Sequence, residues 1–348
     1  METQQNEKTA LITGASSGIG SELTRLFAKD GYALILVDRD ETGMSQLAYN
    51  LKNQYGTQAT LITKDLSDPN SPEEIYAQTS GTTIDVLVNN AGEGEYGRFA
   101  SETDIQRELS IIQANATSLV HLTKLYLKDM VARNDGKILM LGSEVSVAPS
   151  PMMAVYGATK AFIKSFSESV RSELKGNDSK VTITVLMPGA TNTNFFKVAG
   201  AADVKGADPN KTADPAAVAK EGYDALMAGK DHVVAGFVNK LRVAMAHLLP
   251  DPLVAAGARS DMMPRDEAAE KQQQMVLIIA AVSIGVVAGL WLLSRNNNAV
   301  MPNAYDKARY RYKAYKGKRS AEKAIASVGD SVKGAYRKAK NSVEEVSA

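Results

Sequence analysis

Short apolar runs alternate with longer stretches of helical periodicity over the first two-thirds of the chain. Turn-forming residues bound each run, which is typical of buried strands. The predicted strands are 9–13, 33–37, 59–63, 84–89, 137–141, 181–186 and 232–234. The predicted helices are 19–29, 41–53, 105–133, 154–174 and 241–249. This alternation predicts an α/β fold with a doubly wound parallel sheet, the Rossmann fold.

The predicted α/β domain covers residues 1–256. Within it, the segment 203–215 is rich in Gly, Asp, Pro and Ala and indicates a loop or lid. Residues 257–274 indicate a polar linker. Right-handed crossovers bring the carboxyl ends of parallel strands to one edge of the sheet, so a ligand is expected to bind there.

The segment 275–293 differs from everything before it, because it has no charged residue and Ser283 is its only polar side chain. At ~1.5 Å per residue a helix of this length reaches roughly 28 Å, close to the ~30 Å hydrocarbon core of a bilayer. Trp291 lies near its end, where interfacial aromatic residues are favoured. The segment predicts a single transmembrane helix. A buried helix, or one that joins copies in a homo-oligomer, is the alternative.

The net charge of +1 conceals an acidic body and a basic tail. From Arg295 onward there are 13 Lys and Arg against 5 Asp and Glu, whereas the rest has 27 against 34. Tyrosines alternate with Lys and Arg over 305–319, a pattern that suits binding to anionic lipid headgroups. Nucleic acid is the alternative partner, but no other feature of the sequence supports it. Apolar residues at helical spacing over 325–343 predict an amphipathic helix within the tail, 294–348.

The N-terminus carries no signal-peptide pattern, so the α/β domain is expected in the cytoplasm, anchored to a membrane by 275–293. A single membrane span would place the basic tail on the far side of the membrane, whereas basic residues usually stay on the cytoplasmic side. The side on which the tail lies is therefore left open. The chain has no cysteine, which excludes disulfides and thiolate chemistry. His121, His232 and His247 lie far apart, so no metal site is predicted.

A glycine-rich loop over residues 13–20 follows the first predicted strand and opens the first helix. Glycines there allow a tight turn and close approach to a pyrophosphate, although such a triplet alone also fits an ordinary turn. The predicted cofactor contacts in this loop are Gly14, Ser16, Ser17, Gly18, Ile19 and Gly20.

Two residues at the end of the second predicted strand bear on cofactor choice. Asp38 can accept hydrogen bonds from ribose hydroxyls and would repel a 2′-phosphate. Arg39 can pair with that phosphate or stack on adenine. The two residues act in opposite directions on the choice of cofactor. We expect NAD, with NADP as the alternative.

Tyr156 and Lys160 are four residues apart on one predicted helix, so the ammonium can act on the phenol. An unperturbed tyrosine titrates near ~10, and a nearby lysine and a cationic nicotinamide are expected to lower that pKa, so that the phenol exchanges a proton during hydride transfer. Ser143 follows the preceding strand and can hydrogen-bond a substrate oxygen.

Taken together, these motifs resemble the short-chain dehydrogenase/reductase family over residues 7–250. The resemblance implies that Tyr156 is the general acid/base, that Lys160 lowers its pKa and holds the nicotinamide ribose, that Ser143 orients the substrate and that Asn115 supports a proton-relay water. It also implies cofactor contacts at Asp65, Leu66, Asn89, Ala91, Gly92, Pro188, Gly189 and Thr191. Gly142 departs from the second serine found in many members, which leaves Ser143 intact.

The function expected from these residues is NAD(P)-dependent interconversion of a secondary alcohol and a ketone. Apolar residues near the predicted pocket favour a lipophilic small-molecule substrate, although packing under a lid explains them equally well. They are Met152, Met153, Phe195, Phe196 and Val198. The alternative function is a non-catalytic, nucleotide-bound sensor or membrane scaffold on the same fold.

Overall fold

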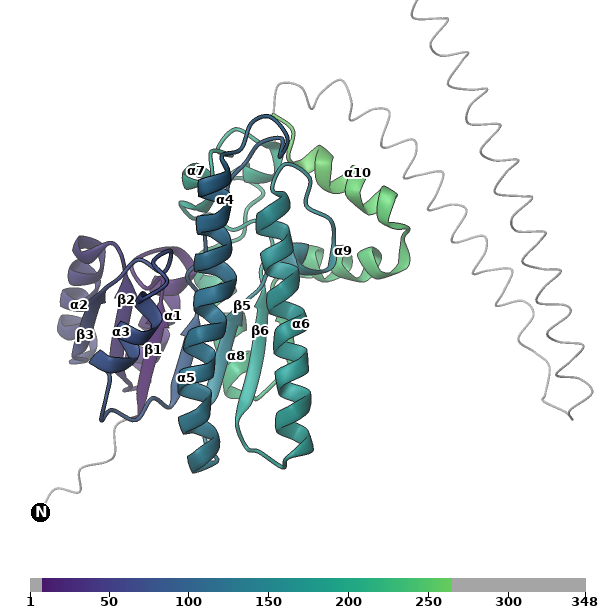
Figure 1. Ribbon diagram of the computed structural model, residues 1–348. Coiled ribbons are helices and arrows are strands. Elements are labelled where there is room, and N and C mark those ends of the chain that lie inside the picture. The colour runs from purple at the N-terminus through teal and green to yellow at the C-terminus, as the bar shows by residue number, and fades with distance from the viewer. Residues whose placement is uncertain (1–7, 265–348) are drawn as a thin grey trace, which may run out of the picture. The chain divides into compact units, whose positions relative to one another are not determined.

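A computed structural model describes residues 8–264 of the protein, in which seven parallel strands form one sheet (Figure 1). The strand order is β3-β2-β1-β4-β5-β6-β7, and it reverses direction at β1, where β4 joins on the other side. This order confirms the predicted doubly wound parallel sheet. The strands are β1 Thr9–Thr13, β2 Ala33–Asp38, β3 Ala59–Thr63, β4 Val86–Asn89, β5 Lys137–Leu141, β6 Thr182–Met187 and β7 His232–Val234.

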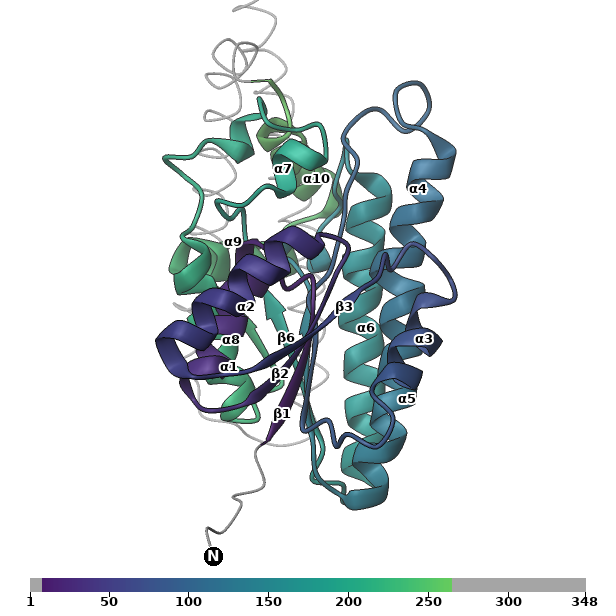
Figure 2. The same cartoon turned by 90° about the vertical axis from the view of Figure 1, so that its left-hand side faces the viewer.

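Helices cover both faces of the sheet, as Figure 2 shows. Alternate strand residues face opposite sides, so Leu11 packs toward α5 and α6, whereas Ala10 and Ile12 pack toward α1, α2 and α8. The longer helices are α1 Gly18–Lys29, α2 Glu41–Tyr55, α5 Ser118–Arg133, α6 Ala154–Gly176, α8 Pro215–Met227, α9 Phe237–Leu248 and α10 Asp251–Asp261. The short ones are α3 Ser71–Gln78, α4 Ile105–Ile112 and α7 Phe195–Val198.

The helix predicted over 105–133 is interrupted by a π-helical turn, Gln113–Thr117, between α4 and α5. The extra residue of such a turn hardly disturbs the apolar periodicity, so the sequence pattern conceals it. Helices α3 and α8 were not predicted. The side chain of Asp214 caps α8, accepting from the backbone N–H groups of Ala216 and Ala217.

The C-terminal boundary of the domain also differs from the prediction. Helix α9 begins at Phe237, earlier than expected, and α10 continues to Asp261, so residues 257–261 are helical and not a linker. Within residues 8–264, no helix is long and apolar enough to cross a membrane. The predicted transmembrane segment 275–293 and the basic tail 294–348 lie outside the described residues.

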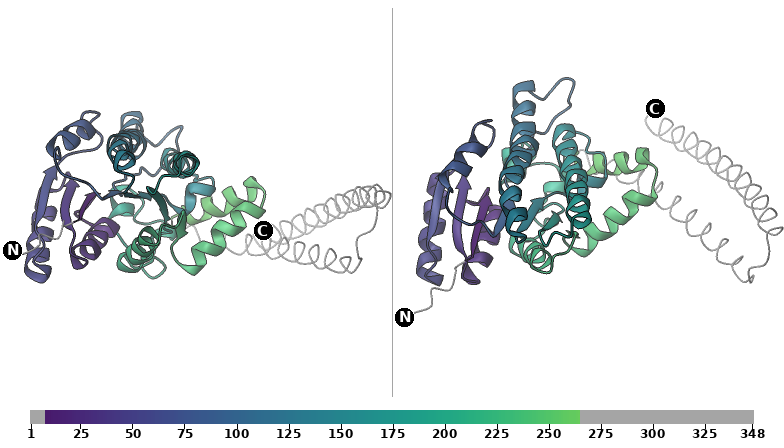
Figure 3. Two further views of the ribbon diagram at one scale, coloured as in Figure 1. Left: turned by 90° about the horizontal axis from the view of Figure 1, so that it is seen from below. Right: turned by 60° about the horizontal axis from the view of Figure 1, so that its bottom comes forward.

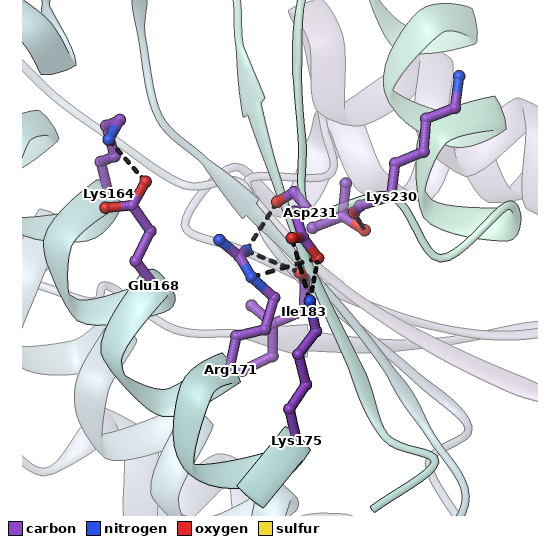
Figure 4. A network of polar contacts seen from close by, with 8 residues as sticks. Lys164, Glu168, Arg171, Lys175, Ile183, Lys230 and Asp231 are labelled. Atoms are coloured by element: carbon purple, nitrogen blue, oxygen red, sulfur yellow. Dashed lines mark hydrogen bonds and ion pairs between the residues drawn. The ribbon is translucent and has the colours of Figure 1, made fainter. Parts of the chain in front are cut away.

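An ion-pair network joins α6 to the loop before β7 (Figure 4). Arg171 donates to the backbone carbonyls of Asp231, at 2.8 Å, and Ile183, at 3.2 Å. The carboxylate of Asp231 also pairs with Arg171 and with Lys175. These contacts hold α6, whose first turns carry Tyr156 and Lys160, against the last two strands of the sheet.

Candidate active site

The predicted site residues gather at the carboxyl edge of the sheet, because nearly all of them lie at the end of a strand or in the loop that follows it. The glycine loop follows β1, Asp38 ends β2, and Asp65 follows β3. Residues 89–92 end and follow β4, Ser143 follows β5, and Pro188 follows β6. Helix α6 brings Tyr156 and Lys160 to the same edge, and the π-turn brings Asn115 there.

The glycine loop is held in a tight turn. Gly14 has a φ of 65°, and its N–H donates to the carbonyl of Val37 at 2.8 Å. A Cβ on Gly20 would lie 2.0 Å from the Gly14 oxygen, so only glycine fits there. The amide of Asn90 donates to the carbonyls of Thr13 and Gly14, at 2.9 and 3.0 Å, and ties the loop to the end of β4.

Helix α1 starts at Gly18, directly after the exposed Ser17, so its N-terminal N–H groups meet the glycine loop. A helix N-terminus attracts anions such as a pyrophosphate. Beside it lies an open pocket of about 280 Å³. The pocket is lined by Gly18, Ser21, Glu22, Asn192, Thr193, Asn194 and Pro215. The loop after β6 therefore covers the start of α1.

Lys160 is 3% exposed, and its ammonium donates to the carbonyl of Leu141 at 2.7 Å. Burial lowers the pKa of Lys160 to about 8, because an ammonium is costly to desolvate. The Nζ atom lies 5.6 Å from the centre of the Tyr156 ring. A Cβ on Gly92 would lie 3.2 Å from the same Nζ, so the backbone after β4 packs closely on the lysine.

Burial of Tyr156 acts against the lowering of its pKa that Lys160 and a cationic nicotinamide are expected to produce. Burial raises the pKa of its phenol to about 12, a hydrogen bond with Ser143 acts in the opposite direction, and the nearby carboxylate of Glu144 raises it further. The reason is that desolvation of the phenolate outweighs the hydrogen bond. At neutral pH the phenol therefore keeps its proton and is poised to donate it.

Ser143 caps a short 3-10 turn, Glu144–Val147, that follows β5. Its hydroxyl accepts the N–H of Val145 at 3.3 Å and lies 3.5 Å from the Pro188 carbonyl oxygen. Both contacts are long for hydrogen bonds. The same side chain also hydrogen-bonds with the Tyr156 phenol, so Ser143 lies beside the group that would donate the proton.

Asn115 lies in the π-turn and is fully buried. Its Oδ1 accepts the N–H of Glu93 at 2.8 Å, and its Nδ2 donates to the Glu93 carbonyl at 2.8 Å and to the Thr159 hydroxyl at 3.1 Å. The Thr159 hydroxyl donates in turn to the carbonyl of Tyr156 at 2.7 Å. Asn115 therefore connects the segment after β4 to the first turn of α6.

A second group of charges lies farther along the edge, after β2 and β3. The Asp38 carboxylate accepts the N–H groups of Ser16, at 2.9 Å, and Asp40, at 3.1 Å. The guanidinium of Arg39 lies 2.5 Å from the Glu93 carboxylate and 3.7 Å from that of Asp65. Glu93 also pairs with Arg107 of α4 at 2.5 Å. Arg39 is thus held between the segments after β3 and β4.

The side chains of Asn89 and Asn90 point in different directions. The Asn89 amide is buried and donates to the Thr123 hydroxyl at 3.0 Å and to the Met140 sulfur at 3.4 Å, so its side chain points into the core beneath the predicted cofactor contacts. The residue that reaches the glycine loop is Asn90, which belongs to the segment 89–92 that the resemblance places along the cofactor ribose. Glu93 was not predicted, because nothing in the sequence pairs it with Arg39.

The other predicted cofactor contacts lie around this centre. Leu66 is buried, and its carbonyl accepts the Ser118 hydroxyl at 2.7 Å. Gly189 lies beneath the amide of Asn239, since a Cβ there would come within 2.3 Å of Asn239 Nδ2. The Thr191 hydroxyl donates to the Gly189 carbonyl at 2.9 Å.

Apolar side chains close one side of the phenol. The Phe195 ring lies 4.9 Å from the Tyr156 ring, centre to centre, and the side chains of Phe195 and Met153 both meet Gly94. Met152 has a φ of 67°, an uncommon conformation for a bulky residue at the edge of this group. Val198 faces solvent on α7 and takes no part.

Comparison with known proteins agrees with this geometry. The sequence model of the short chain dehydrogenase family matches residues 8–203. An uncharacterized short-chain type dehydrogenase/reductase of Sinorhizobium fredii is 35% identical over 202 residues, 57% of this chain and 76% of that protein. A mouse (Mus musculus) protein, very-long-chain 3-oxoacyl-CoA reductase, is 31% identical over 192 residues, which span 54% of this chain and only 61% of the mouse protein.

Among solved structures, a short-chain dehydrogenase from Sphingobium yanoikuyae in complex with NADPH is similar. It is 27% identical, with a TM-score of 0.61, over 69% of this chain and 93% of that one. The family match covers more than half of the chain and contains the glycine loop, Asn115, Ser143, Tyr156 and Lys160. The protein belongs to the short-chain dehydrogenase family of oxidoreductases, whose members bind a nicotinamide cofactor.

Proposed function

We propose that the protein is an NAD(P)-dependent oxidoreductase that interconverts a secondary alcohol and a ketone on a lipophilic substrate. The observation that carries this proposal is the buried ammonium of Lys160, fixed by the Leu141 carbonyl beside the protonated phenol of Tyr156. Burial of a cation costs folding free energy. Two neighbouring groups with shifted pKa values at a ligand-binding edge are typical of a catalytic site.

The residues present fit a nicotinamide dinucleotide. The glycine loop leaves no room for a Cβ at Gly20, and the start of α1 offers N–H groups for a pyrophosphate. When bound, the reduced cofactor supplies a hydride to the carbonyl carbon. In our proposal Tyr156 gives its proton to the carbonyl oxygen and Ser143 holds that oxygen by a hydrogen bond. Lys160 binds the cofactor ribose, and Asn115 positions the α6 turn that carries the phenol and supports a water that returns the proton.

For the cofactor we propose a preference for NAD over NADP. Asp38 places a carboxylate at the end of β2, where it favours ribose hydroxyls over a phosphate. The competing cation, Arg39, is already paired with Glu93 and Asp65 and is less available to a 2′-phosphate. The similar Sphingobium structure contains NADPH, so both cofactors belong in the test.

For the substrate we propose a bulky, lipophilic ketone or alcohol. Phe195 and Met153 give the region beside the phenol an apolar wall. The mouse relative is named for a reductase of very-long-chain 3-oxoacyl-CoA, whose acyl chain is long and apolar and carries a ketone. We further propose that the apolar segment 275–293 attaches the protein to a membrane, with the catalytic domain in the cytoplasm.

The test is a panel of ketones, from small and polar to long-chain, assayed with NADH and with NADPH. Tyr156→Phe removes the transferable proton and keeps the ring, and the exposed Tyr49→Phe is its matched control. We expect turnover of lipophilic ketones that Tyr156→Phe abolishes and Tyr49→Phe preserves. Equal turnover by Tyr156→Phe would refute the mechanism. Cofactor binding without turnover of any ketone would favour the alternative of a non-catalytic sensor.

A further inference from the structure

Helix α9 presents an apolar stripe to solvent. Phe237 is 81% exposed, Leu241 56% and Leu248 77%, and Val238 is 62% exposed at its margin. Phe237, Leu241 and Leu248 lie at helical spacing, so they share one face of the helix. We call these four residues the α9 stripe. An exposed stripe of this kind on a soluble domain marks an interaction surface.

The opposite face of α9 holds the helix to the catalytic domain. Asn239 packs over Gly189, and Val243 packs against the core. Arg242 pairs with Glu144, which directly follows Ser143, at 3.5 Å and with Asp261 of α10 at 3.4 Å. The inner face of α9 thus borders the candidate active site, and the stripe is not needed to seat the helix. Figure 3 shows α9 and α10 in green at the end of the sheet opposite β3.

The charge of α9 indicates the kind of surface it fits. The helix contains Lys240, Arg242 and His247 and no acidic residue, although Lys240 pairs with Glu221 of α8 at 3.2 Å and Arg242 has the two pairs named above. On a helical wheel, Lys240 and His247 fall on one side of the stripe and Arg242 on the other. Apolar residues flanked by cations are the pattern of helices that lie in the interface of an anionic bilayer.

The length of the chain that follows limits how far this surface can lie from the apolar segment. The described residues end at Pro264, and the apolar segment begins at Met275, eleven residues later. An extended chain of that length spans at most about 40 Å. If 275–293 enters a bilayer, α9 and α10 are therefore tethered within a short distance of its surface.

We infer that the α9 stripe lies in the headgroup region of an anionic membrane, with the candidate active site directly behind it. This inference rests on the proposed membrane attachment through 275–293. It deepens the proposed function, because it would place the candidate active site close to the lipid from which a lipophilic substrate comes.

The test uses the full-length chain, which has no cysteine, so that a single introduced thiol is labelled alone. Leu248→Cys places an environment-sensitive fluorophore on the stripe, and Tyr49→Cys places it on α2, 64% exposed, as the matched control. The proteins are mixed with phosphatidylcholine vesicles containing phosphatidylserine and recovered by flotation. Quenching is then measured with aqueous iodide and with nitroxide-labelled lipid.

We expect the label at 248 to be quenched by nitroxide lipid, and by iodide about threefold less than the label at 49, because an interfacial residue is shielded from water. Iodide quenching equal to that at 49 would overturn the inference. Protection from both quenchers would overturn it too, since a second copy or the chain's own tail would then cover the stripe. Failure to float refutes membrane attachment and the inference together, whereas the ketone panel tests the oxidoreductase proposal separately.

Discussion

The two ends of the proposed cofactor site are built in different ways. At the nicotinamide end, Lys160 and Asn115 are buried and joined to neighbouring backbone by hydrogen bonds of 2.7 to 2.8 Å. At the adenine end, Arg39 is half-exposed and is held by ion pairs to Glu93 and Asp65. Buried polar groups are costly to leave unpaired, whereas exposed ion pairs contribute only ~0–1 kcal/mol.

This difference separates two properties of the enzyme. The reaction depends on groups that the fold fixes before any ligand arrives, so their loss is expected to be severe. The choice of cofactor depends on side chains that solvent already screens, so it is expected to change by small factors. Substitutions are therefore expected to have their largest effects at the nicotinamide end and their smallest at the adenine end.

Lys160→Met should cause the largest loss. Methionine fills the volume but removes both the ammonium and its bond to Leu141, so kcat/KM is expected to fall by about 10³-fold or more. Lys164→Met, one turn later on α6, removes only a surface pair with Glu168 and is the control. Similar losses in both variants would mean that the helix, and not the buried cation, carries the effect.

The same buried lysine should give stability a distinctive dependence on pH. Its pKa is about 8 in the folded protein against 10.5 ordinarily, so between these values the unfolded chain binds a proton that the folded chain has lost. Stability therefore rises with pH across this window, by up to about 3 kcal/mol. Denaturant titrations from pH 7.5 to 10.5 should show this rise in the free energy of unfolding for wild type relative to Lys160→Met. Parallel curves for the two proteins would contradict a buried, cationic Lys160.

Asn115→Ala should have a smaller effect on turnover, because Asn115 acts by positioning the α6 turn and a water. The substitution leaves the N–H and carbonyl of Glu93 and the Thr159 hydroxyl without their amide partner. We expect kcat to fall about tenfold, with KM for the cofactor little changed. The pH profile of kcat should shift as well, which a merely destabilised protein would not show. Asn134→Ala, at the exposed end of α5, controls for general destabilisation.

Glu93→Gln should produce the smallest change and affect only the adenine end. Removal of the carboxylate releases Arg39 for a 2′-phosphate, so the affinity for NADPH is expected to rise about fivefold while that for NADH stays the same. Calorimetric titration with each cofactor measures this directly. Glu102→Gln, which breaks an exposed pair with Arg98, is the control. Unchanged affinity for NADPH would show that Glu93 does not restrain Arg39.

Most of the fold follows from local pattern. The apolar runs at 9–13 and 137–141 coincide with β1 and β5, because a parallel strand buried on both faces is apolar throughout. The π-turn at Gln113–Thr117 and helix α8 were missed for different reasons. One extra residue leaves the periodicity nearly intact, and the segment before α8 is rich in Asp, Gly, Asn and Pro, which favour turns.

The site was predictable where a single strand end or helix turn places the residue, as for Tyr156, Lys160 and Ser143. It was not predictable where tertiary contacts decide direction. Asn89 is the last residue of β4 and points into the core, whereas Asn90 lies beyond the strand and turns to the glycine loop. The phenol pKa depends on burial that no spacing reveals, and Glu93 meets Arg39 only in the folded chain.

We propose that this site transfers a hydride from a nicotinamide to a carbonyl carbon, with a proton from Tyr156. An isotope experiment gives the full-length protein NADH deuterated at the transferable position of its nicotinamide ring, together with the lipophilic ketones, and follows the product by mass spectrometry. We expect deuterium on the carbinol carbon of the alcohol with the wild type, and none with Tyr156→Phe. Tight binding of the cofactor with no label in any product of the wild type would contradict it.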